Sequence, residues 1–71
     1  MTPEQIEHWF MHHPPQDLAT INKYAAIRAA GKLLALAILE TTPAGADQAA
    51  AVRKVREAVM TANAAIACEG K

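Results

Sequence analysis

Residues 41–45 read Thr-Thr-Pro-Ala-Gly and separate two long segments in which apolar residues recur at helical spacing. Proline lacks an N–H donor and glycine tolerates unusual backbone angles, so this stretch ends one helix and forms a turn. A connection this short makes two long helices antiparallel neighbours. The sequence therefore predicts an all-α fold built on a long antiparallel hairpin.

The two predicted hairpin helices cover residues 16–40 and 47–68, and Asp47 is the expected N-cap of the second. Each has roughly 22–25 residues and hence a length of about 35 Å. The buried side of the first is marked by Leu18, Ile21, Ala25, Ile27, Leu34, Ala37 and Ile38. In the second, apolar residues recur at spacings of 3, 4, 3 and 4, which is typical of a packing seam. This valine seam consists of Val52, Val55, Val59, Ala62 and Ile66.

A short helix is predicted over residues 3–11, ahead of the hairpin. Thr2 is its expected N-cap, followed by a proline and an acid in the first turn. Two consecutive prolines prevent it from continuing, so residues 12–15 form a proline elbow. Trp9 and Phe10 are expected to anchor this helix on the hairpin; the alternative is that they wall a pocket at the elbow.

Size and composition predict a single domain, residues 1–71, that assembles as a homo-oligomer. Hydrophobic residues make up 52% of the 71, but alanine is the commonest and buries little area. Folding must offset roughly 1–2 kcal/mol of backbone entropy per residue. Burial of apolar surface stabilises the folded state by only about 25 cal/mol per Å². Helix packing between subunits would supply the missing burial.

Several classes of function are disfavoured. Seven basic residues balance seven acidic ones, which argues against a duplex nucleic-acid binder. The longest apolar run, Leu33 to Leu39, is too short to span a membrane, and no signal peptide is apparent. The single cysteine excludes an internal disulfide. We therefore expect a soluble intracellular protein.

The sequence does not indicate an enzyme, a cofactor or a metal site. It contains no serine and no glycine-rich phosphate loop, and Cys68 stands three residues from the end. His8, His12 and His13 fall within six residues, but the elbow is expected to keep His8 and His12 off a shared helical face. Cys68 would complete a ligand set only if the fold brought it there. Ordinary hydrogen bonds are the favoured role of these histidines.

Binding of a polar ligand has better support. Tyr24, Arg28 and Lys32 are spaced by four and form one helical stripe with an aromatic ring and two cations. The alternative is a solvated cationic stripe. Arg56 and Asn63 border the valine seam, where they either serve a subunit interface or hydrogen-bond a polar ligand.

Three stretches resemble a known family of small phage proteins. They are FMHHPP at residues 10–15, YAAIR at 24–28 and EAVMTANAAIA at 57–67, of which the last is the most specific. They are similar to the phage anti-CBASS cyclic-nucleotide sponge family, whose helical hairpin is shared with some anti-Thoeris sponges. The resemblance spans nearly the whole chain in the same order.

The resemblance implies a homohexamer that sequesters cyclic dinucleotides such as cyclic GMP–AMP, and cyclic trinucleotides, without cleaving them. Its place of action would be the cytoplasm of the infected bacterial host, where it keeps CBASS effectors inactive. His12 stands where the family usually has a base-stacking tyrosine, and Arg28 matches the basic residue that contacts phosphates. The resulting candidate site comprises His12, His13, Pro14, Tyr24, Arg28, Lys32, Arg56 and Asn63.

A second hypothesis needs no nucleotide. In it the chain is a helical-hairpin module for oligomerisation or for binding a protein partner through its valine seam and the patch of Trp9 and Phe10.

Overall fold

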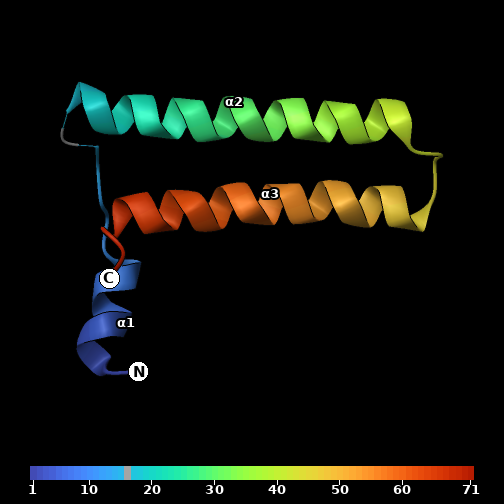
Figure 1. Ribbon diagram of the computed structural model, residues 1–71. Coiled ribbons are helices and arrows are strands. Elements are labelled where there is room, and N and C mark those ends of the chain that lie inside the picture. Colours follow the sequence, from blue (N-terminus) through green and yellow to red (C-terminus); the bar gives the residue numbers. More distant parts are fainter. Residues whose placement is uncertain (16) are drawn as a thin grey trace.

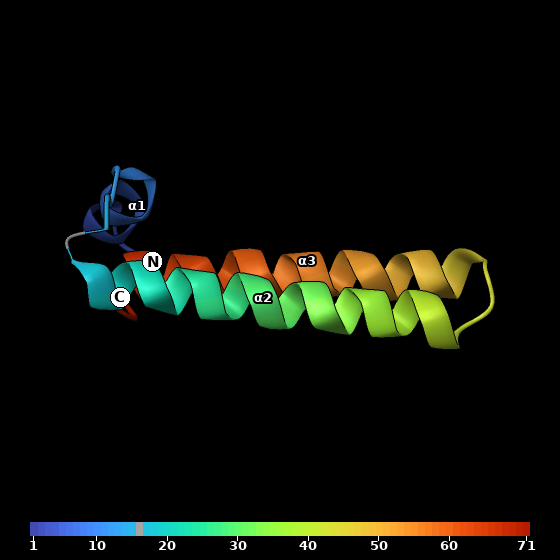
Figure 2. The ribbon, with the colours of Figure 1, turned by 90° about the horizontal axis from the view of Figure 1, so that it is seen from above.

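A computed structural model of the chain describes residues 1–15 and 17–71, and within these ranges it contains three α-helices and no strand. They are α1 (Pro3–Phe10), α2 (Leu18–Thr41) and α3 (Ala46–Ala67). Figures 1 and 2 show α2 and α3 side by side and antiparallel, with α1 projecting from the open end of the hairpin. The predicted all-α class and the hairpin are thus confirmed.

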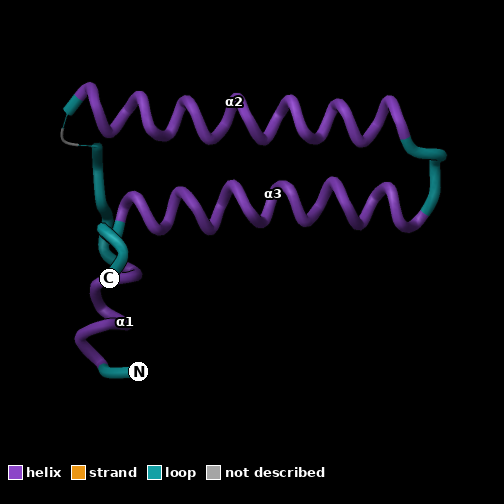
Figure 3. The backbone as a smooth tube through the Cα atoms, viewed as in Figure 1, coloured by secondary structure: helices purple, strands orange, loops and turns teal. Residues whose placement is uncertain are grey.

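Helix α1 begins as its sequence indicates. Thr2 Oγ1 accepts the backbone N–H of Gln5 at 3.1 Å, and the Gln5 side chain returns a hydrogen bond to the N–H of Thr2. This reciprocal capping box satisfies two donors that a helix start leaves free. The helix ends at Phe10, one residue before the predicted end, because Met11 is already extended on entering the elbow. Figure 3 shows the elbow and the hairpin turn as non-helical segments.

Helix α2 is capped by Asp17, whose Oδ1 accepts the N–H of Thr20 at 2.8 Å. The predicted start at residue 16 lies outside the described residues. Hydrogen bonds from the backbone and side chain of Thr20, and the charge of Lys23, hold the pKa of Asp17 below its ordinary value of 3.8. At the other end the hydroxyl groups of Thr41 and Thr42 donate back to carbonyls of the last turn.

The start of α3 corrects one expectation. The N-cap is Gly45, with φ of 159°, and not Asp47, which lies in the first turn. Glycine makes the sharp change of direction there, so the helix begins before the acid, whose charge still favours the positive helix end. Gln48 closes the turn by donating to the carbonyls of Leu39 and Thr42 at 3.3 and 3.0 Å.

The two long helices pack most closely around Gly31. A Cβ atom added there would collide with Cγ2 of Val59 and would meet Cγ1 of Val55 at 3.9 Å. The missing side chain therefore lets the valine seam of α3 lie directly against the backbone of α2. Gly31 is thus a packing residue as well as a weak point of the helix.

The single chain has little core. Cys68, with 8% exposure, is the one buried residue in the described part of the chain, and the valine seam is half-buried. The radius of gyration is 15.1 Å, against about 11 Å for a compact domain of this length. None of the described helices combines the length and hydrophobicity needed to cross a membrane.

The buried face of α2 differs from the predicted one. Four residues expected inside are exposed: Leu18, Ile21 and Leu34, at 70%, 48% and 54%, and Ala37. Ala25, Ile27 and Ile38 are half-buried. Apolar residues surround nearly the whole helix, so their spacing does not single out the side that α3 covers.

Replacing Gly31 with alanine should destabilise the protein. Crowding the stiff Val59 side chain costs about 1–3 kcal/mol, while alanine gains roughly 1 kcal/mol over glycine in a helix. Thermal unfolding should show a lower Tm for Gly31→Ala. Ala29→Gly, at an exposed position of α2, measures the propensity term separately. A higher Tm for Gly31→Ala would show that the close approach is not restrictive.

Replacing Asp17 with asparagine should make the free energy of unfolding depend less on pH in the acidic range. A carboxyl group whose folded pKa is lowered stabilises the fold above its unfolded pKa, and this contribution is lost as pH falls through the folded value. Asparagine also caps helices but does not titrate. Urea unfolding between pH 2 and pH 6 should therefore show a smaller loss of stability below about pH 4 for Asp17→Asn. Equally steep losses in both proteins would contradict this role.

Candidate functional site

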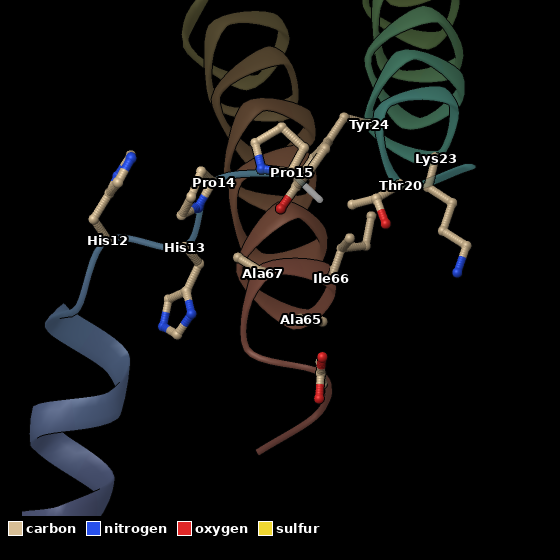
Figure 4. Close-up of a pocket in the computed structure, with 11 residues that line it drawn as sticks. His12, His13, Pro14, Pro15, Thr20, Lys23, Tyr24, Ala65, Ile66 and Ala67 are labelled. Atoms are coloured by element: carbon tan, nitrogen blue, oxygen red, sulfur yellow. The ribbon is translucent and has the colours of Figure 1, made fainter. Parts of the chain in front are cut away.

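A cavity of about 500 Å³ lies where the proline elbow meets the open end of the hairpin (Figure 4). We call it the elbow cavity. The elbow forms one wall, the first turns of α2 form another, and the last turn of α3 forms the floor. Its lining residues are His12, His13, Pro14, Pro15, Thr20, Lys23, Tyr24, Ala65, Ile66, Ala67 and Glu69. Its volume falls in the range of pockets that hold small organic ligands.

Tyr24 supplies the main aromatic surface. Its half-buried side chain reaches from α2 toward Pro15 and across the end of α3 (Figure 4). The rings of Pro14 and Pro15 and the imidazole of His12 belong to the same lining. Such surfaces suit the stacking of a planar heterocycle.

Six of the eleven residues that line the cavity carry polar side chains. Lys23 is exposed and directs its ammonium away from the elbow (Figure 4). Glu69 also belongs to the lining, and its carboxylate is 3.9 Å from the Lys71 ammonium, with both side chains exposed. Thr20 adds a hydroxyl, and its backbone N–H donates to Oδ1 of the Asp17 cap. The lining therefore combines the aromatic ring of Tyr24 and the apolar side chains of the prolines and Ile66 with several polar and charged groups.

The elbow histidines point in different directions. Figure 4 shows the rings of His12 and His13 on opposite sides of the elbow. His12 is exposed, whereas the half-buried His13 places its Nε2 2.6 Å from the carbonyl of His8. His8 in turn places its Nε2 3.2 Å from the carbonyl of Cys68. These contacts link α1, the elbow and the end of α3.

The two aromatic residues of α1 have different environments. Trp9 donates its indole N–H to the carbonyl of Lys71 at 3.2 Å, which ties α1 to the C-terminal segment as expected of an anchor. Phe10 is 85% exposed and does not anchor the helix, so that expectation was wrong for the isolated chain. Neither residue belongs to the lining of the elbow cavity.

The structure brings half of the candidate binding residues into this cavity. His12, His13, Pro14 and Tyr24 line it, whereas Arg28, Lys32, Arg56 and Asn63 do not. Arg28 and Lys32 are exposed on α2, one and two turns beyond Tyr24, and Arg56 is exposed on α3.

Asn63 is half-buried, and its Oδ1 is shielded from solvent with no hydrogen-bond partner in the described residues. An acceptor left in that state costs about 1–3 kcal/mol.

Sequence reasoning overlooked two lining residues of α2. Thr20, Lys23 and Tyr24 stand at positions i, i+3 and i+4, so they share one face of the helix. This spacing is visible in the sequence, but Lys23 lies outside the i+4 stripe from Tyr24 to Arg28 that predicts the binding face.

Comparisons with known proteins agree with this architecture. Searches of curated proteins and of solved structures find no significant match. The model of the family described as "Acb2/Tad1, hairpin domain" matches residues 2–67 and so includes α1, the elbow and both long helices. This confirms the resemblance carried by residues 10–15, 24–28 and 57–67, and the chain belongs to the Acb2/Tad1 hairpin domain family.

Proposed function

We propose that this protein binds cyclic oligonucleotide second messengers and sequesters them without cleavage, which keeps the effectors of bacterial CBASS defence inactive. The observation that carries the proposal is the elbow cavity, lined by Tyr24, His12 and two prolines, in a chain of the Acb2/Tad1 family. Cyclic dinucleotides such as cyclic GMP–AMP are the first candidates, followed by cyclic trinucleotides. The place of action would be the cytoplasm of an infected bacterium.

The cavity suits the base of such a ligand. A purine can stack on Tyr24 with His12 at the other edge, where imidazole offers a smaller stacking surface than tyrosine. The Thr20 hydroxyl can exchange hydrogen bonds with a base or ribose, and the Glu69 carboxylate can accept from a base amino group. The apolar floor would exclude water from the stacked base.

Phosphates would lie outside the base pocket, along α2. Arg28 and Lys32 continue the face of Tyr24 toward the middle of the hairpin, and both are exposed. The planar guanidinium of Arg28 can pair two phosphate oxygens at once. A cyclic dinucleotide has only two phosphates, so a few cations suffice in a chain of zero net charge.

Assembly into a homo-oligomer, a hexamer by family resemblance, would complete the site. Leu33, Leu36 and Leu39 on α2 are 69%, 41% and 58% exposed, although a helix that is apolar nearly all round is normally covered. Neighbouring copies would cover these side chains. The same contacts can bring Arg56 and Asn63 of one copy toward the ligand of another.

A binding module for a protein partner is the second candidate, favoured by the exposed leucines of α2 and by Phe10. It predicts no affinity for any cyclic nucleotide. Calorimetric titration with cyclic GMP–AMP, followed by a panel of cyclic dinucleotides and trinucleotides, separates the two. Saturable binding with intact ligand recovered supports sequestration, whereas no heat with the whole panel would favour the partner module. Degraded ligand would instead indicate an enzyme.

Removing the Arg28 guanidinium should weaken ligand binding. A hydrogen bond to a charged group contributes about 1.5–3 kcal/mol, so Arg28→Ala should raise the Kd roughly 10- to 150-fold. Arg53→Ala, an exposed cation on α3, is the matched control and should bind like the wild type. Unchanged affinity in a folded Arg28→Ala protein would contradict the phosphate role.

A charge on the exposed side of α2 should disrupt the assembly. In an isolated chain, Leu33→Glu changes a surface residue and should alter stability by no more than about 0.5 kcal/mol. Within an oligomer it places a carboxylate in an apolar interface, so light scattering should show a smaller mass and the Tm should fall. Asn22→Asp, at an exposed polar position of α2, adds the same single negative charge and is the matched control. A wild type that scatters as a 7.6 kDa monomer would refute the oligomer.

A further inference from the structure

Three metal-ligating side chains from distant parts of the chain meet at the junction of α1, the elbow and α3. One ring nitrogen of His8, one of His13 and the sulfur of Cys68 all lie within 4.8 Å of one another. The two imidazole rings are 4.7 Å apart between centroids and meet edge to face. Tertiary structure alone gathers these groups, because Cys68 is separated from His8 by 60 residues.

The burial of this cluster distinguishes it from the scattered acids of the surface. Cys68 is 8% exposed and both histidines are half-buried. Cys68 also belongs to the lining of an open groove of about 460 Å³, together with Trp9 and the end of α3. The three metal-ligating side chains are therefore shielded from solvent, and one of them, Cys68, borders an open groove.

The hydrogen bonds of the two imidazole rings occupy Nε2 in each and leave Nδ1 of each ring as the nitrogen that can ligate a metal. Nε2 of His8 lies 3.2 Å from the Cys68 carbonyl, and Nε2 of His13 lies 2.6 Å from the His8 carbonyl. A carbonyl oxygen only accepts, so both Nε2 atoms carry the proton, and a neutral ring then keeps an unprotonated Nδ1. An N–H given to a backbone carbonyl is the usual outer-shell contact of a metal-bound histidine.

We propose that His8, His13 and Cys68 bind a zinc-like divalent ion. Two imidazole nitrogens and one thiolate are a donor set that Zn²⁺ prefers, and a fourth tetrahedral position would remain for water. Bond lengths near 2.0–2.3 Å require donors about 3.3–3.7 Å apart, so the side chains need to close by roughly 1 Å. His13 belongs to the non-helical elbow, and this freedom makes such an adjustment easy.

The ion would fasten α1 to the hairpin. The described hydrogen bonds between α1 and the C-terminal segment come from His8 and Trp9. A metal bridging His8, His13 and Cys68 would add a link that exists only in the folded state and would stabilise it accordingly. The ion would also restrict the conformation of the elbow, because His13 is part of it. This effect does not depend on which ligand binds in the elbow cavity.

Titration of metal-free full-length protein tests this site directly. Zn²⁺ should bind with one ion per chain and raise the Tm. Co²⁺ used as a separate probe should give thiolate-to-cobalt charge-transfer absorption and the intense visible bands of tetrahedral coordination. No saturable Zn²⁺ binding at micromolar concentrations, or a cobalt spectrum without the thiolate bands, would overturn the proposal.

Substitutions identify the ligands. His8→Gln, His13→Gln and Cys68→Ser should each weaken Zn²⁺ binding more than about 100-fold, since loss of a ligand exceeds the usual effect of an outer-shell change. His12→Gln is the matched control, because that neighbouring ring lies on the other side of the elbow, and it should retain the metal affinity. Circular dichroism reports whether each variant folds. If Cys68→Ser does not fold, the two histidine variants still test the assignment. Equal affinity in the folded variants would refute the assignment.

Discussion

The close approach of α2 and α3 at Gly31 is the constraint on which the rest of the structure depends. Because Gly31 has no side chain, Val59 lies directly against the backbone of α2 and the hairpin is narrow. The lengths of the helices then place the end of α3 beside the start of α2, where the elbow crosses from one to the other (Figure 1). The elbow cavity exists because these three segments end at the same place.

A narrow hairpin also leaves most of α2 uncovered, and this has a direct bearing on function. The valine seam covers one side of α2, while leucines on the other sides remain exposed. Covering them with further copies would supply burial that a chain with one buried residue among those described lacks. In such an assembly the cations outside the cavity, Arg28 and Lys32, need not act on the cavity of their own chain.

Local features of the fold could be predicted from sequence, whereas the choice of packing face could not. Caps and turns depend on a few neighbouring residues, so Thr2 and residues 41–45 were informative. The prediction of Asp47 as the N-cap of α3 was wrong because the helix begins two residues earlier, after Gly45. The buried side of α2 was ambiguous because the helix is apolar nearly all round. The meeting of Cys68 with the histidines depends on where α3 ends relative to the elbow, which spacing along the chain does not encode.

The elbow couples the two proposed sites because adjacent residues serve both. Both His12 and His13 belong to the lining of the elbow cavity, and His13 also contacts α1 through the His8 carbonyl. Residues joined by one peptide unit cannot be positioned independently, so any ligand that orders His13 restricts His12 and Pro14 as well. If a metal favours the elbow conformation that binds a nucleotide, the nucleotide must favour metal binding by the same factor, since coupling free energies between binding sites are reciprocal. The docking of α1, which lies outside the elbow cavity, would then also affect the affinity of that cavity for its ligand.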